Sequence, residues 1–129
     1  SMNLASFKSL ADALVLLMSP LIEVVIHDLR SQTVCYIAGN LSKRQIGDPS
    51  LLELETLEAD LDQIVYPKSN FDGRLVKSIS VKLSDDFLFC INCDVTIFNQ
   101  IKNLSEKFLN FDSKKPKSLF ENDWQEKLN

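Results

Sequence analysis

The amino-acid sequence predicts an α+β domain with a five-stranded antiparallel sheet and short helices packed on one face of that sheet. Two observations lead to this fold class. Five short segments have the β-branched or alternating composition of strands, whereas the segments around them have helical spacing. Short turn sequences follow several of these strand segments, and tight turns favour antiparallel neighbours.

The N-terminal part predicts a helix followed by a hairpin. From Leu4 to Met18, apolar residues recur every three or four positions, as they do along one side of a helix. Pro20 ends this helix because its ring cannot continue the hydrogen-bond ladder. Residues 23–29 and 34–38 are short β-branched runs separated by a tight connection, so we expect them to pair.

The middle of the chain predicts an excursion away from the sheet. Residues 39–49 are polar and contain few strand formers, and a short helix with leucines on one side is predicted over residues 51–61. Residues 64–67 are extended in pattern and lead into the turn at residues 70–73.

The C-terminal part predicts two further strands and a helix. Residues 75–83 alternate, and residues 87–95 form the most apolar strand, which we therefore place at the centre of the sheet. Apolar residues with spacings of four, three, four and three then predict a helix with a coiled-coil seam: Ile97, Ile101, Leu104, Phe108 and Phe111.

Composition excludes several classes of function. The net charge of −4 gives no positive field for a nucleic-acid backbone, so we expect these 129 residues to bind no nucleic acid. No apolar run approaches the roughly 20 residues of a membrane span. Lys8 and Asp12 interrupt the N-terminal apolar stretch, which argues against a signal peptide. Three cysteines without framework spacing suit a reducing compartment, and we expect a cytoplasmic protein.

The first candidate site residues end the first strand. His27 and Asp28 are adjacent, so their side chains point to opposite faces and form no direct catalytic pair. His27 is either a ligand contact or a structural histidine. Asp28 either contacts a ligand or accepts from backbone donors in the following turn.

Further candidates are basic or hydroxylic. The planar fork of Arg44 suits a carboxylate or phosphate on a small metabolite, although a salt bridge to an aspartate is the alternative. Lys77, Ser78 and Ser80 lie on one strand, and Ser78 and Ser80 share one face of it. The apolar residues of this strand mark the opposite face as the more buried one, so we expect both serines to face solvent, unless Lys77 marks the wet side.

On the last strand, Asn92 and Asp94 share a face. They either contact a ligand or hold the start of the following helix. Cys90 and Cys93 point to opposite faces, and the sequence contains no Cys/His pair, metal-ligand spacing or glycine-rich phosphate loop. We therefore expect a protein that is not an enzyme and that needs no cofactor or metal.

Four segments resemble the YheO-like PAS family of bacterial transcriptional regulators: residues 23–29, 39–49, 72–78 and 90–96. Their order and spacing fit the family over residues 20–98. Ala38 stands where the family usually has asparagine, and Lys43 stands where it usually has glycine. The family normally continues into a DNA-binding helix-turn-helix, which is not seen before Asn129, so we expect either a part of a longer regulator or a stand-alone sensor.

The resemblance implies a PAS-like sensor domain over residues 20–98, with a flanking helix at 1–19 and a signalling helix and tail at 99–129. The first hypothesis is a homodimer that pairs through the Leu4–Met18 and Ile97–Phe111 helices and senses a small polar or anionic metabolite. The second is a ligand-free interaction or dimerisation module. A cavity filled by Phe and Leu side chains would favour the second hypothesis, and a space lined by polar groups would favour the first.

Overall fold

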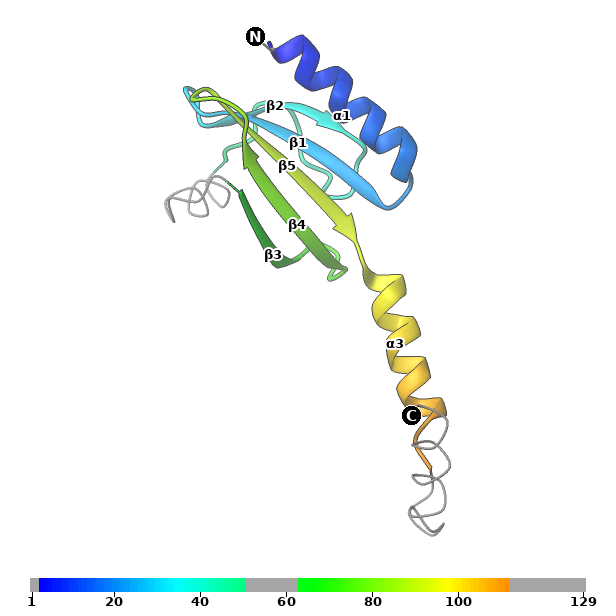
Figure 1. The fold of residues 1–129 in the computed structure, drawn as a ribbon. Helices are drawn as coiled ribbons and strands as arrows, with labels where there is room; N and C mark the ends of the chain where they lie inside the picture. The colour runs from blue at the N-terminus through cyan, green and yellow to red at the C-terminus, as the bar shows by residue number, and fades with distance from the viewer. Residues whose placement is uncertain (1–2, 51–62, 112–129) are drawn as a thin grey trace. The chain divides into compact units, whose positions relative to one another are not determined.

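The computed structural model describes residues 3–50 and 63–111, and within them five strands form one antiparallel sheet (Figure 1). The elements in chain order are α1 (Leu4–Met18), β1 (Ile22–Asp28), β2 (Thr33–Ala38), β3 (Gln63–Ser69), β4 (Leu75–Lys82), β5 (Phe87–Asp94) and α3 (Thr96–Phe108). The strand order β2-β1-β5-β4-β3 places β5 at the centre, as its apolar sequence predicts. The predicted fold class is confirmed. The helix predicted over residues 51–61 lies outside the described residues.

Helix α1 covers the apolar face of the sheet. Asn3 caps the helix, because its side-chain oxygen accepts from the backbone N–H of Ser6 at 3.1 Å. The helix packs mainly on β1 and β2. Its contacts form the main apolar cluster, whose buried members are Phe7, Ala11, Val24, Ile26, Ala38 and Phe89.

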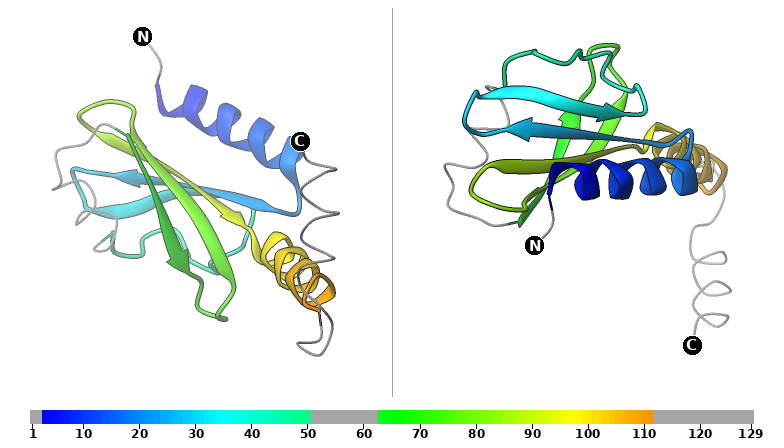
Figure 2. Two further views of the ribbon diagram at one scale, coloured as in Figure 1. Left: turned by 60° about the horizontal axis from the view of Figure 1, so that its bottom comes forward. Right: turned by 90° about the horizontal axis from the view of Figure 1, so that it is seen from above.

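The opposite face of the sheet carries the loop that follows β2. Both views in Figure 2 show α1 on one side of the strands and this loop on the other. Val24 and Ile26 of β1 belong to the cluster under α1. Because side chains alternate along a strand, Glu23, Val25 and His27 face the loop. A second, smaller apolar cluster lies there, formed by Val25, Val34, Leu88 and Cys90.

Helix α3 belongs to a second compact unit that begins at Ile97. It ends at Phe108, so Phe111, which the sequence pattern placed in the helix, lies beyond its end. Every side chain from Ile97 to Phe108 is exposed. In the part of the chain that the structure describes, no helix combines the length and apolar character needed to cross a bilayer.

Candidate ligand-binding site

Six buried polar side chains gather on the sheet face opposite α1. They are Glu23, His27, Ser50, Ser78, Ser80 and Asn92, each at most 4% exposed, and we call them the polar face. Five come from β1, β4 and β5, and Ser50 ends the described part of the loop after β2. Buried polar groups need hydrogen-bond partners, so their connections show how this face is organised.

A row of hydrogen bonds crosses three neighbouring strands. The antiparallel register pairs Glu23 with Asn92 and Asn92 with Ser78, which brings the three side chains onto one line. The amide of Asn92 donates to Glu23 Oε1 at 3.0 Å, and the hydroxyl of Ser78 donates to Asn92 Oδ1 at 2.6 Å. The carboxylate of Glu23 is therefore the acceptor at the end of the row.

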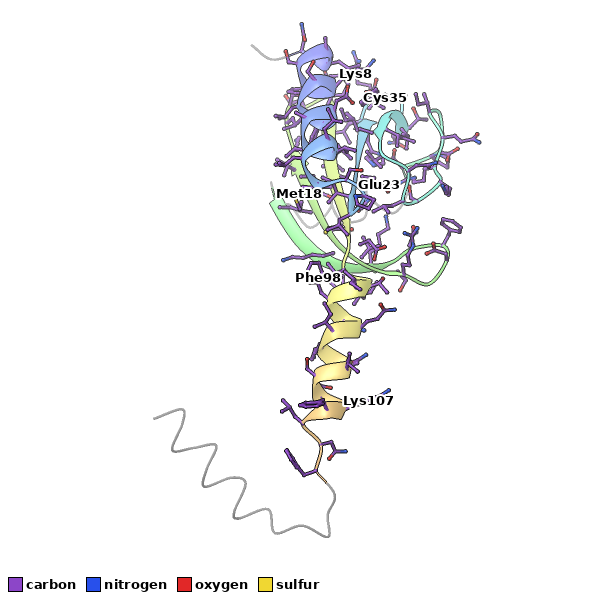
Figure 3. The ribbon with its side chains drawn as sticks, turned by 90° about the vertical axis from the view of Figure 1, so that its right-hand side faces the viewer. Lys8, Met18, Glu23, Cys35, Phe98 and Lys107 are labelled. Carbon is purple, nitrogen blue, oxygen red and sulfur yellow. The ribbon has the colours of Figure 1, made fainter. Side chains whose placement is uncertain are left out.

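Glu23 is a buried carboxylate held by neutral donors. Its side chain lies near the start of β1, beside the loop that follows β2 (Figure 3), and the residue is 1% exposed. Its Oε2 accepts from the backbone N–H of Ser42 at 2.9 Å. Among the described residues, its two partners are this N–H and the Asn92 amide, so no cation offsets the cost of removing a carboxylate from water.

The hydroxyl of Ser42 adds a further polar atom beside Glu23. Its Oγ is buried and has no hydrogen-bond partner among the described residues. A buried hydroxyl without a partner costs stability, so a ligand or a water molecule at this point would satisfy it. Glu23 and Ser42 together offer an acceptor and a hydroxyl in one place.

The far end of the polar face holds the loop to the sheet. The Nδ1 atom of His27 lies 2.5 Å from Ser50 Oγ, and the backbone N–H of Ser50 donates to the carbonyl of Gln32 at 3.0 Å. Ser80 Oγ lies 3.1 Å from Cys90 Sγ in the next row of the register. Within residues 3–50 and 63–111, no three His, Cys, Asp or Glu side chains come together as a metal site.

Three of the predicted site residues meet on the polar face, namely His27, Ser78 and Asn92. The expectation that Ser78 and Ser80 face solvent is wrong, because Ser78 is 0% and Ser80 is 3% exposed. The prediction assumed that the apolar residues of β4 mark its buried side. Helix α1 packs mainly on β1 and β2, so the apolar side of β4 stays only half-buried.

The other four predicted residues lie elsewhere. Asp28 accepts from the backbone N–H of Arg30 at 2.8 Å, so it holds the turn after β1, as one of its two interpretations predicts. Hydrogen bonds from the Arg30 side chain and backbone lower the pKa of the Asp28 carboxyl. Arg44 Nη2 donates to the carbonyl of Pro49 at 2.9 Å, and Lys77 is exposed.

Asp94 holds the start of α3, the second of its two interpretations. Its Oδ1 accepts from the backbone N–H of Thr96 at 3.0 Å, and its Oδ2 lies 3.1 Å from Arg74 Nη1. Hydrogen bonds from the Thr96 side chain and backbone, helped by Arg74, lower the pKa of Asp94 against the opposing effect of burial.

Sequence reasoning missed Glu23, Ser42, Ser50 and Arg74. Glu23 did carry a signal, since a single glutamate stands in an otherwise apolar strand and shares a face with His27 four residues later. Ser42 and Ser50 lie in a polar loop, where the sequence does not distinguish a serine that contacts the sheet from one that faces solvent. Their roles depend on contacts with distant strands, which no local pattern encodes.

Comparison with known proteins gives two matches. The model of the YheO-like PAS domain matches residues 1–110. The transcriptional regulator DauR of Pseudomonas aeruginosa is 42% identical over 138 residues, an alignment that covers 98% of this chain and 65% of the relative. The chain thus spans just under two thirds of the length of this relative. No solved structure gives a significant match.

Proposed function

Because this chain belongs to the YheO-like PAS domain family, we propose that it is the ligand-sensing domain of a cytoplasmic transcriptional regulator. Its similarity to DauR, which is named a transcriptional regulator, supports the regulatory role. The role is binding and signalling, without catalysis. The buried carboxylate of Glu23 is the observation that supports the ligand site most strongly.

The chemistry around Glu23 favours one class of ligand. A carboxylate attracts hydrogen-bond donors and repels anions, and this effect is stronger where water is excluded. The neighbouring Ser42 hydroxyl can accept or donate. Arg44, the expected partner of an anion, donates instead to a loop carbonyl. We therefore propose a small polar metabolite that presents nitrogen or hydroxyl donors to Glu23.

A thermal-shift titration tests this proposal. The purified chain is screened against polar metabolites that carry amino, hydroxyl or carboxylate groups. A ligand that binds only the folded state stabilises it by about 2.7 kcal/mol at roughly 100 times its Kd, which raises the melting temperature by several degrees. We expect stabilisation by donor-bearing compounds and none by simple dicarboxylates.

The variant Glu23→Gln assigns the site. It keeps the size of the side chain and removes its charge, so the ligand-dependent shift should fall even if the free variant melts earlier. Glu106→Gln, at an exposed position of α3, is the control that should respond as the wild type does. Stabilisation of Glu23→Gln equal to that of the wild type would refute the site, and a screen without hits would refute the sensing role.

A second candidate function, a ligand-free dimerisation module, is favoured by the apolar side chains of the two helices. Exposed residues on α3 include Ile101 (55%), Leu104 (69%) and Phe108 (84%), and on α1 they include Leu16 (82%) and Leu17 (78%). A helix of 13 residues is marginal in water by itself, so α3 gains stability by covering its apolar side. The pairing of two copies through these helices is also compatible with ligand sensing.

A further inference from the structure

The loop that contacts Glu23 is also tied to a second hydrogen-bonded group. Ser42 donates its N–H to Glu23, and the preceding residue, Leu41, is 7% exposed. The carbonyl of Leu41 accepts from Arg74 Nη2 at 3.3 Å and from Asn70 Nδ2 at 2.7 Å. Any displacement of this loop segment at Glu23 therefore acts on Arg74.

Arg74 uses its whole guanidinium to join three segments. Nε donates to Asp72 Oδ2 at 2.7 Å in the turn before β4, and Nη1 donates to Asp94 Oδ2 at 3.1 Å at the end of β5. Nη2 bonds the loop carbonyl. A planar fork can hold these three acceptors at once, whereas the single ammonium of a lysine cannot match the same geometry.

Asp94 carries the connection to the first residue of α3. Its Oδ1 accepts from the N–H of Thr96 at 3.0 Å, while Thr96 Oγ1 accepts from the N–H of Leu75 at 3.1 Å. A carboxylate beside a helix start is stabilising because the first N–H groups of a helix lack partners within it. The orientation of Asp94 thus affects how firmly α3 begins.

We propose that Arg74 is a positioning residue that couples the loop at Leu41 and Ser42 to the start of α3. The role of a ligand as the event that moves the loop rests on the function proposed above. A ligand that competes for Glu23 shifts Ser42, and the Leu41 carbonyl moves with it. The hydrogen bond from Arg74 to Asp94 then changes, and the stability of the first turn of α3 changes with it. Coupling between the two ends is present in the free protein and can be measured there.

Amide hydrogen exchange followed by NMR tests the coupling without a ligand. In Arg74→Lys we expect exchange to be about three- to tenfold faster at the amide of Thr96 and at amides 100–102, because a local opening becomes easier. Arg30→Lys is the matched control, since Arg30 also lies near two aspartates, Asp28 and Asp86, in a turn remote from Thr96. Unchanged exchange in β5 verifies that each variant is folded, and Arg74→Gln repeats the test with a neutral side chain.

The double variant decides whether Arg74 carries the connection. Glu23→Gln replaces one acceptor oxygen by an NH₂ group, so it weakens one of the two bonds that Glu23 accepts. We expect Glu23→Gln to speed exchange at Thr96 about threefold in the wild type and to have no added effect in Arg74→Lys. An equal effect in both backgrounds, or unchanged exchange at Thr96 in Arg74→Lys, overturns the proposal. If the coupling is found but no compound in the screen stabilises the protein, the sensing role is refuted and the coupling proposal stands.

Discussion

Lys43 has a backbone φ of +58°, in the left-handed region where the similar loop of the family usually has glycine. The loop therefore forms this left-handed turn with a bulky side chain in it. A non-glycine residue in this region costs about 1–2 kcal/mol. The neighbouring contacts of the loop, which include the bond from Ser42 to Glu23, hold the strained residue in place.

Gly39 is a stricter position than Lys43, and we predict that Gly39→Ala destabilises the domain by about 2–5 kcal/mol. Its φ is +80°, and an added Cβ would lie 2.8 Å from the carbonyl oxygen of Ile22 and 3.1 Å from Cα of Glu23. Both atoms belong to the backbone of β1 and cannot move aside cheaply.

Gly47→Ala is the control for this prediction. Its φ is +96°, but nothing lies within 4 Å of the added Cβ, so only the conformational cost of about 1–2 kcal/mol remains. Urea denaturation of both variants measures the difference. Equal losses of stability would show that β1 does not restrict Gly39.

At the scale of elements, the sequence predicts which helices and strands form, and in what order, better than it predicts which side of each element is buried. The strands and both helices follow from periodicity, because hydrophobic spacing reflects local geometry. The buried side of β4 does not follow from it. Whether the side of β4 that carries Ser78 and Ser80 is buried depends on where α1 packs and on the register of β4 with β5. Both are contacts between distant segments.

Helix α3 gives the prediction at this scale. Its apolar residues Ile97, Ile101, Leu104 and Phe108 follow one side of the helix, and all are exposed. If two copies pair through this side, Leu104→Glu removes a buried leucine from each copy, which costs about 1.5–3 kcal/mol per copy. We expect the dissociation constant of the dimer to rise by about 10²–10⁴-fold, measured by sedimentation equilibrium.

Asn103→Glu adds the same charge about 100° around the helix from Leu104, outside the line of apolar residues, where the side chain is also exposed. We expect this control to dimerise like the wild type. A wild type that stays monomeric at high concentration, or a Leu104→Glu variant that dimerises unchanged, would contradict pairing through α3.

At the scale of the whole molecule, aspartates paired with arginines connect turns and strand ends around the sheet. Asp28 lies beside Arg30, and Asp72 and Asp94 lie beside Arg74. The pKa of each of the three carboxyls is lowered from its ordinary value of 3.8. A group whose pKa is lower in the folded state stabilises that state above the ordinary value, and this contribution is lost as the pH falls through the folded value.

We therefore predict that the free energy of unfolding falls as the pH drops below about 4, and that Asp94→Asn removes part of this dependence. At pH 6 the variant should be less stable than the wild type, because asparagine cannot replace the charge beside Arg74. As the pH falls below about 4 the gap between the two should narrow, since a protonated Asp94 has lost the same charge. Urea denaturation across this range measures the gap, with Asp85→Asn at a fully exposed turn position as a control that should follow the wild type. A gap of constant size from pH 6 to pH 2.5 would show that the charge of Asp94 contributes nothing to the stability of the fold.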